Sequence, residues 1–188
     1  MATCGRARSH STKSAGLDTK KREGTSLLIG VISDTHGYVD PCLGDVFQGV
    51  EYILHAGDIG APEVLDALGA LAPVLAVRGN VDRDPGLLKL PEQLNLLMAG
   101  VTIQVVHRLD DACPGPETRV LIHGHSHRPI VEWRQNILYL NPGAAGRQGF
   151  HTERTAALLD LAGSPTGALI RLGPKALGGT PGRKRRTA

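Results

Sequence analysis

Seven side chains of this sequence could bind metal ions, and they stand in short polar segments that follow apolar runs. They comprise two carboxylates, one amide and four imidazoles: Asp34, His36, Asp58, Asn80, His107, His125 and His127. Oxygen and nitrogen donors without sulfur are the ligands of divalent ions such as Mn, Fe, Ni or Zn. Because seven donors exceed what one tetrahedral site needs, the set favours two ions that share a bridging carboxylate.

Two neighbouring dications have a defined chemistry. At a separation of about 3.5–4 Å they polarise a phosphoryl oxygen and acidify a bridging water into a hydroxide that can attack phosphorus near neutral pH. They also balance the charge that spreads over the equatorial oxygens of a phosphoester, which otherwise requires Arg or Lys. The donor set therefore predicts a phosphohydrolase.

The first three polar segments each follow a predicted β-strand. The run Leu27–Ile32 is rich in β-branched residues and too short for a helix, and residues 52–54 and 74–77 are similar. A short helix is expected over 40–48, and Pro62 begins an amphipathic helix. This alternation predicts a parallel βαβαβ unit, and open sheets of this kind bind ligands at the carboxyl ends of their strands.

The second half of the chain is predicted to contain strands joined by turns. Pro114 and Pro116 exclude a helix over 110–118. The predicted strands span residues 94–97, 101–106, 120–122, 131–133, 137–140, 155–161 and 168–172. We expect two packed sheets with helices outside. Residues i and i+2 of an extended chain share a face, so the pairs Asp34/His36 and His125/His127 are expected to converge.

With these motifs the sequence resembles the calcineurin-like metallophosphoesterases, and among them the small single-domain prokaryotic phosphodiesterase branch. The matching motifs occur in the family's order, within a resemblance that covers about residues 27–161: Asp34-Thr35-His36, Gly57-Asp58, Gly79-Asn80, His107, Gly124-His125-Ser126-His127 and Asn141-Pro142-Gly143. The resemblance implies an α/β fold, a four-layer αββα sandwich of two mixed β-sheets flanked by helices.

The resemblance also implies a ligand set for each ion. The first ion would be held by Asp34, His36, Asp58 and His127, and the second by Asp58, Asn80, His107 and His125, with Asp58 as the bridge. Asp58, Asn80 and His107 are then the expected catalytic residues. Members of the family use mostly Mn²⁺, with Fe, Ni, Zn or Mg in some, to hydrolyse phosphomonoesters or phosphodiesters.

Two positions depart from the family pattern. Val81 stands where many members have a His that could protonate the leaving group, so low-pKa leaving groups and diesters are favoured. Arg108 stands where a Gly usually follows the metal-binding His, and a short Pro-Gly-Pro loop replaces a common helix. Two nearby residues leave alternatives open: Arg78 could contact phosphate or form an ion pair, and Asp82 could support the ligands or lie in an exposed acidic turn.

The remaining histidines are expected to have supporting roles or none. His55 and His123 lie in apolar strands. Each is predicted to support a metal ligand or to belong to the core, with its ring N–H on a carbonyl or a carboxylate, and not to be a ligand itself. His10 and His151 are predicted to be surface residues. Cys113 could be a soft metal ligand or an incidental loop thiol.

The charge of the chain divides into three parts. Residues 1–24 carry six Lys or Arg and two acids, residues 171–188 carry six bases and no acid, and the total of +3 leaves a net of −7 for residues 25–170. We therefore expect disordered basic tails at 1–25 and 174–188 around one domain at 26–173. Three cysteines without CxxC spacing suit a reducing cytoplasm, and no apolar run is long enough to cross a membrane.

Three functions remain open at this point. A phosphohydrolase acting on a small phosphoester or phosphodiester is the main hypothesis. A non-enzymatic scaffold is the second, because a retromer sorting subunit resembles the same branch but has a degraded metal site. The third is a nucleic-acid-processing enzyme that grips phosphates with the basic tails, which the acidic body does not favour.

Overall fold

Ten β-strands are the main regular structure of the computed structural model, which describes residues 27–175. Five form the first sheet: β1 (Leu28–Ile32), β2 (Tyr52–His55), β3 (Val74–Ala76), β9 (Glu153–Asp160) and β10 (Thr166–Pro174). Five form the second: β4 (Gln93–Met98), β5 (Val101–Val106), β6 (Thr118–Ile122), β7 (Ile130–Arg134) and β8 (Ile137–Asn141). The predicted tails lie outside the described residues, except that β10 continues through Pro174.

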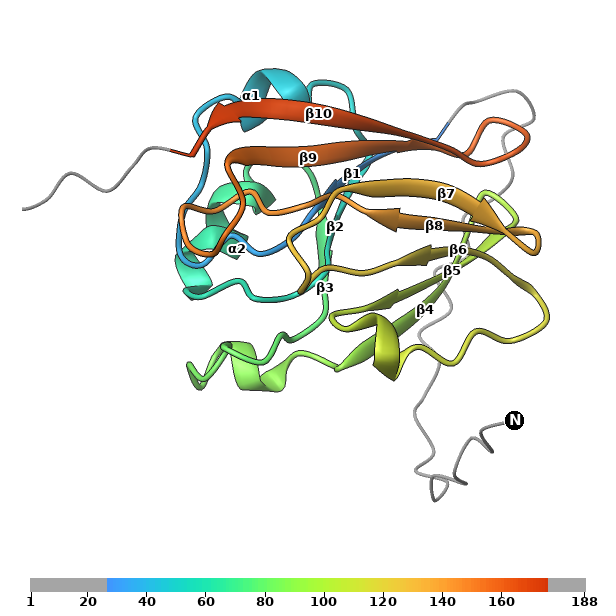
Figure 1. Cartoon of the computed structure of the whole chain (residues 1–188), viewed down its shortest axis with the longest axis horizontal. Coiled ribbons are helices and arrows are strands. Elements are labelled where there is room, and N and C mark those ends of the chain that lie inside the picture. The colour runs from blue at the N-terminus through green and yellow to red at the C-terminus, as the bar shows by residue number, and fades with distance from the viewer. Residues whose placement is uncertain (1–26, 176–188) are drawn as a thin grey trace, which may run out of the picture.

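The two sheets stack face to face (Figure 1). Their strand orders are β10-β9-β1-β2-β3 and β4-β5-β6-β8-β7. The strands β1, β2 and β3 are parallel to one another, and so are β5, β6 and β8. In the first sheet β9 runs antiparallel to both β1 and β10, and in the second sheet the edge strands β4 and β7 run antiparallel to their neighbours. The predicted βαβαβ unit and the predicted sandwich of two mixed sheets are thus confirmed.

Two α-helices cover the outer face of the first sheet. They are α1 (Leu43–Val46) and α2 (Pro62–Gly69), and their apolar side chains share a buried cluster with Ile32 and Ile53. The helix α1 is shorter than the predicted 40–48, because Asp40 accepts the N–H of Cys42 before it and Gly49 reverses the chain after it with φ +82°.

The second sheet carries no α-helix of its own within residues 27–175. Two short 3₁₀ turns, η1 (Leu87–Lys89) and η2 (Leu109–Asp111), precede and follow its first two strands. Pro114 and Pro116 lie in an irregular segment before β6. The prediction that they exclude a helix over 110–118 therefore agrees with the structure. Arg108 thus lies in the segment between β5 and β6, in which η2 is the one stretch of regular structure.

The core lies between the sheets and continues beneath the helices. Alternate residues of β1 point to opposite sides: Ile29 and Val31 belong to the cluster between the sheets, and Ile32 belongs to the cluster under the helices. A strand that is buried on both faces needs a continuous apolar run, which is what the sequence of β1 provides. Gly30 interrupts that run because a Cβ there would lie 2.9 Å from the buried ring of Phe47.

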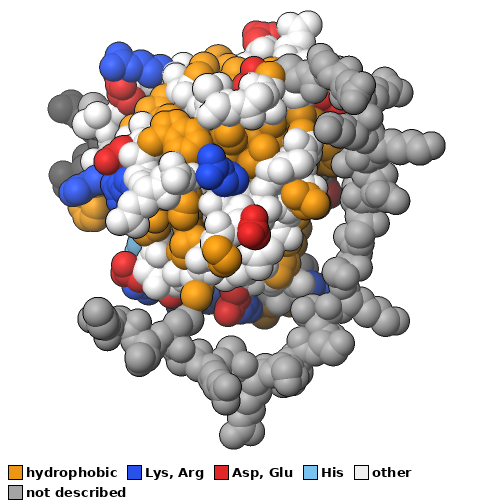
Figure 2. All heavy atoms as spheres, turned by 90° about the vertical axis from the view of Figure 1, so that its right-hand side faces the viewer, with side chains coloured by type: hydrophobic (Ala, Val, Ile, Leu, Met, Phe, Trp, Pro, Cys, Tyr) orange, Lys and Arg blue, Asp and Glu red, His pale blue; other side chains and the backbone are white. Residues whose placement is uncertain are grey.

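The surface has a mixed character. On the face that Figure 2 shows, hydrophobic side chains are interspersed with single acidic and basic ones. The described basic side chains on this face do not form a continuous surface. Among the described residues, the helices are all too short or too polar to cross a bilayer.

Candidate metal centre

The polar segments after five strands come together at one end of the sandwich, towards which the arrows of β6 and β8 point in Figure 1. Backbone hydrogen bonds join these segments across the molecule. The N–H of Asp34 donates to Gly57 O, that of His36 donates to Asp58 O, and that of Gly124 donates to His107 O, each at 3.0 Å. The segments that carry the predicted ligands are therefore fixed to one another.

A first group of donors consists of Asp34, His36 and His127, whose ligand atoms lie within 4.8 Å of one another. Nε2 of His127 is 3.3 Å from Oδ1 of Asp34 and 3.4 Å from Nε2 of His36. The other oxygen of Asp34 accepts the backbone N–H of His125, and the Ser33 hydroxyl lies 2.7 Å from it. Asp34 is wholly buried and thus has a fixed orientation.

A second group consists of Asp58, His107 and His125, again within 4.8 Å. Nε2 of His107 lies 3.2 Å from Oδ1 of Asp58 and 3.0 Å from Oδ1 of Asn80. Nδ1 of His107 donates to the carbonyl of Ala56 at 2.8 Å, so Nε2 is the ring nitrogen that faces the group. All seven predicted ligands are thus placed in or beside two adjacent groups.

The backbone that carries these side chains is unusual. Five predicted ligands have positive φ, between 48° and 65°: Asp34, His36, Asp58, His125 and His127. The side chains therefore converge through left-handed turns after the strands, and the expected extended i, i+2 geometry is wrong. Non-glycine residues adopt such φ rarely, and the strain tends to be kept at functional sites.

Glycines let the ligand side chains pack against neighbouring backbone. A Cβ at Gly79 would lie 2.1 Å from Oδ1 of Asp58, and one at Gly57 would lie 2.7 Å from Nδ1 of His107. A Cβ at Gly124 would lie 2.8 Å from Oδ2 of Asp34. The Gly in each motif is thus explained by close approach.

Burial and charge shift the pKa values of the site. Burial lowers the pKa of His36, which favours the neutral imidazole that binds metals. Burial acts in the same direction on His107, but the hydrogen bond and charge of Asp58 outweigh it and raise the pKa of that imidazole. Burial alone would raise the pKa of Asp58, whereas His107 and the N–H of Val81 lower it overall.

Asp82 is a buried support and does not lie in an exposed turn. Only 2% of its surface is exposed, and its two oxygens accept the backbone N–H groups of Gly60 and Gly79 at 2.8 Å each. It thereby ties the loop after β3 to the loop after β2. Arg78 forms an ion pair with Glu92, so the ion-pair alternative holds for that residue.

The two buried histidines outside the groups differ in how they match the prediction. Nδ1 of His123 lies 3.4 Å from the carbonyl oxygen of Gly124, as predicted, whereas the ring of His55 contacts a backbone N–H and a hydroxyl. Nδ1 of His55 accepts the N–H of Gly57 at 3.2 Å, and its Nε2 lies 3.0 Å from the Thr35 hydroxyl. His123 lies 3.2 Å from the amide of Asn141, and that amide also donates to Gly124 O. The motif that begins at Asn141 therefore supports the loop carrying His125 and His127.

The prediction of a surface position for His151 is wrong. This residue is only partly exposed, and its Nδ1 lies 3.2 Å from Nδ1 of His127. Its Nε2 donates to Gly146 O at 3.0 Å. His151 precedes β9 in an irregular loop, so no spacing or strand end in the sequence indicated the contact.

The buried carboxylate of the first group fits a bound cation. Oδ1 of Asp34 is buried and accepts no hydrogen bond. A buried carboxylate oxygen without a partner is costly, and a dication would supply that partner. With two imidazole nitrogens beside it, the donor set suits a borderline divalent ion.

The amino-acid sequence is similar to those of known proteins. The model of the family described as calcineurin-like phosphoesterase superfamily domain matches residues 27–164. A probable metallophosphoesterase of Methanocaldococcus jannaschii is 39% identical over 137 residues, which are 64% of this chain and 69% of that protein. A probable metallophosphoesterase of Methanothermobacter thermautotrophicus is 35% identical over 135 residues, or 63% of this chain and 77% of that protein.

Solved structures share the fold. A novel archaeal phosphodiesterase superimposes with a TM-score of 0.66 at 23% identity, covering 77% of this chain and 99% of that one. Vps29 of Entamoeba histolytica in complex with Zn²⁺ gives a TM-score of 0.59 at 21% identity, covering 78% and 99%. A predicted phosphoesterase of Streptococcus pneumoniae gives 0.62 at 23%, covering 82% and 95%.

Proposed function

Because the chain belongs to the calcineurin-like phosphoesterase superfamily, we propose that it is a phosphodiesterase that uses two divalent metal ions. The observation that carries the proposal is the pair of adjacent donor groups at the carboxyl ends of the strands. Each group offers one carboxylate and two imidazoles, which is enough for one ion with open positions for substrate.

The described side chains divide between the two proposed ions. Asp34, His36 and His127 would hold the first, and Asp58, Asn80, His107 and His125 the second, with Asp58 as the proposed bridge. When bound, two such ions supply Lewis-acid polarisation of the phosphoryl group and a nucleophile derived from water. We propose Mn²⁺ as the ion, with Fe, Ni, Zn or Mg as alternatives.

Residues of the chain prepare this chemistry by holding each ligand in place. The Ala56 carbonyl keeps the Nδ1 proton of His107, which leaves Nε2 available. The N–H of Val81 donates to Oδ1 of Asp58 at 3.1 Å, so the loop after β3 fixes the orientation of the carboxylate. Such preorganisation removes reorganisation of the ligands from the reaction.

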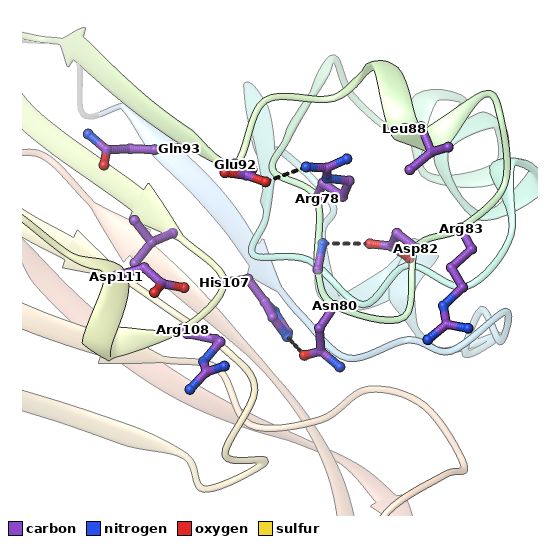
Figure 3. A pocket seen from close by; sticks show the side chains of 12 residues that line it. Arg78, Asn80, Asp82, Arg83, Leu88, Glu92, Gln93, His107, Arg108 and Asp111 are labelled. Carbon is purple, nitrogen blue, oxygen red and sulfur yellow. Dashed lines mark hydrogen bonds and ion pairs between the residues drawn. The ribbon is translucent and has the colours of Figure 1, made fainter. Parts of the chain in front are cut away.

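An open cavity beside the second group supports a small substrate. It has a volume of about 530 Å³, and Asn80, His107, Arg83 and Arg108 are among the residues that line it. Figure 3 shows the guanidinium groups of Arg83 and Arg108 on opposite sides of Asn80. An ester whose phosphorus lies at the metal groups could place one of its substituents in this cavity.

The side chain that follows Asn80 favours a phosphodiester with a stable leaving group as the substrate. Val81 is apolar and 41% exposed, and only its backbone N–H makes a polar contact, with Asp58. Its side chain cannot donate a proton to the leaving oxygen. Phosphodiesters with low-pKa leaving groups need such a donor least.

The experiment is hydrolysis of bis(p-nitrophenyl) phosphate by the full chain, with Mn²⁺ added to protein stripped of metal. We expect turnover in the wild type and a loss of about a hundredfold or more for Asp58→Asn. Asp66→Asn is the matched control, because Asp66 is exposed on α2. Absence of turnover with Mn, Ni, Fe and Co alike would overturn the proposal.

The scaffold is a second candidate because Vps29 shares the fold. The two functions differ in metal chemistry. Calorimetric titration of Mn²⁺ should show two ions per chain for the enzyme, whereas weak binding without turnover would favour the scaffold.

Deletion of 1–24 and 175–188 tests the nucleic-acid alternative, since tails that bind phosphates would steepen the salt dependence of RNA or DNA binding. The cysteine usage of the sequence supports a cytoplasmic location.

A further inference from the structure

His127 of the first group also contacts His151, a residue outside the sequence motifs. Its Nε2 faces Oδ1 of Asp34 and Nε2 of His36, at 3.3 and 3.4 Å. Its Nδ1 faces Nδ1 of His151 at 3.2 Å, and the two rings meet edge to face with their centroids 5.1 Å apart. The two nitrogens of His127 therefore have separate partners.

The proton positions follow from the last acceptor in this series of contacts. The carbonyl of Gly146 can only accept, so Nε2 of His151 carries a hydrogen and donates it over 3.0 Å. In a neutral imidazole the other nitrogen then has a lone pair, so Nδ1 of His151 accepts a hydrogen from Nδ1 of His127. Nε2 of His127 is left with its lone pair towards Asp34 and His36.

We propose that His151 is a positioning residue that keeps the proton of His127 on Nδ1 and so makes Nε2 the ligand atom of the first group. The inference rests on the proposed function only in that the first group binds an ion. The tautomer of His127 is a property of the protein without metal.

The loop that carries His151 is built against the ligand segment. The N–H of Gly146 donates to Asp34 O at 3.0 Å, so the acceptor of His151 is itself tied to the first motif. A Cβ at Gly149 would lie 2.2 Å from Nδ1 of His127, which shows how closely the loop approaches that ring. The contact between the two imidazoles is therefore enclosed by backbone on one side.

In the second group the proton of the ligand histidine is held on Nδ1 without an intervening side chain. There the Ala56 carbonyl accepts directly from Nδ1 of His107. In the first group a carbonyl and a histidine together perform this task. A neutral His151 that donates its Nε2–H to the carbonyl presents Nδ1 to His127 as an acceptor. Substitution of His151 should therefore allow the Nε2–H tautomer of His127 to form without removing a metal ligand.

The experiment measures tautomer and metal affinity in the full chain. Ring ¹⁵N chemical shifts of metal-free protein at pH 8 should show His127 protonated at Nδ1. In His151→Ala, the Nε2–H tautomer should appear, and calorimetric titration with Mn²⁺ should show one of the two ions bound about ten- to a hundredfold more weakly.

Two further variants separate positioning from general damage. In His151→Asn, Oδ1 can take the place of Nδ1 as acceptor, so the tautomer and affinity should return close to those of the wild type. Thr152→Ala changes an exposed neighbour on the same loop and should leave both unchanged. Backbone amide spectra of each variant verify that it is folded.

The outcomes distinguish this inference from the proposed function. A wild type with His127 protonated at Nε2, or a folded His151→Ala with unchanged tautomer and affinity, would overturn the role of His151. So would an Asn variant that binds Mn²⁺ as weakly as the Ala variant while His127 keeps its tautomer, because His151 would then be a ligand itself. A wild type with the expected tautomer and no metal binding would instead contradict the proposed function.

Discussion

The left-handed backbone of five predicted ligands is the residue-scale feature on which the site depends. Each such residue costs about 1–3 kcal/mol and persists only where its surroundings enforce it. Here the enforcement comes from backbone hydrogen bonds between the loops and from glycines such as Gly60, where a Cβ would lie 2.6 Å or less from neighbouring main-chain atoms of Gly37 and His36. The ligands are therefore arranged by the fold before any ion binds.

His55 provides a prediction at this scale. It is wholly buried, and burial lowers its pKa from 6.5 to about 4. Between these values the unfolded chain takes up a proton that the folded protein does not, so the free energy of unfolding should fall as the pH falls, by up to about 1.4 kcal/mol per pH unit. The contribution of His55 is complete above pH 6.5 and lost at about pH 4.

The measurement is urea unfolding with a chelator present, at several pH values between 7.5 and 5. His55→Asn is the comparison variant, because its Oδ1 can accept the N–H of Gly57 but the side chain does not titrate. Its stability should depend less steeply on pH than that of the wild type. Equal slopes for the two proteins would show that His55 does not control this dependence.

The candidate ligands could be predicted from the sequence because they follow apolar runs directly. Asp34, Asp58 and His107 each stand within three residues of a strand end, where local pattern is informative. His151 could not be predicted, because it meets His127 across 24 positions through a loop without periodicity. Contacts of that kind depend on tertiary packing and leave no local signal.

At the scale of elements, the packing of α1 on β1 depends on one missing side chain. The ring of Phe47, which follows α1, lies over Gly30 of β1 with 2% of its surface exposed. A Cβ on Gly30 would approach three ring atoms to 2.9–3.1 Å. Because β1 is the central strand of its sheet and cannot shift freely, the ring or the helix must move instead.

Gly30→Ala should therefore reduce the free energy of unfolding by about 1–3 kcal/mol. Gly44→Ala is the matched control, since Gly44 lies in α1 with open space around its Cα, and it should stabilise the protein by roughly 0.5–1 kcal/mol. Denaturant unfolding of both variants measures the difference. A neutral or stabilising Gly30→Ala would mean that Phe47 can repack.

The type of most elements could be predicted, and so could the parallel unit of β1, β2 and β3, but the strand that completes the first sheet beside β1 could not. Hydrophobic runs and Pro62 indicated the strands of both sheets and the start of α2. The pairing of β1 with β9 could not be predicted, because the strands are 121 or more positions apart, from Ile32 to Glu153, and no pattern in either specifies the other. The helix α1 ends at Val46, two residues before the predicted end, and no periodicity in so short a segment marks that position.

At the scale of the whole molecule, each donor group takes ligands from both sheets. Asp34 and Asp58 follow strands of the first sheet, and His107 and His127 follow strands of the second. An ion in either group would therefore join the sheets at one end of the sandwich. Metal binding should affect the stability of the entire domain.

Removal of metal should thus lower the stability of the folded protein. At a free Mn²⁺ concentration about one hundred times the Kd, each occupied site contributes about 2.7 kcal/mol to the free energy of unfolding. Excess EDTA should abolish that gain, and amide hydrogen exchange should then accelerate at the ends of β1 and β6 together. Acceleration in one sheet alone would contradict a role of the ions in joining the two.

The position of β1 between β2 and β9 has a consequence for the order of folding. This strand is synthesised before every other element that the structure describes, yet its partner β9 is the second to last of them. During translation one edge of β1 must wait until residues 153–160 have left the ribosome. Closing so long a loop slows folding, so the nascent chain spends its synthesis with an exposed strand edge that a chaperone could cover.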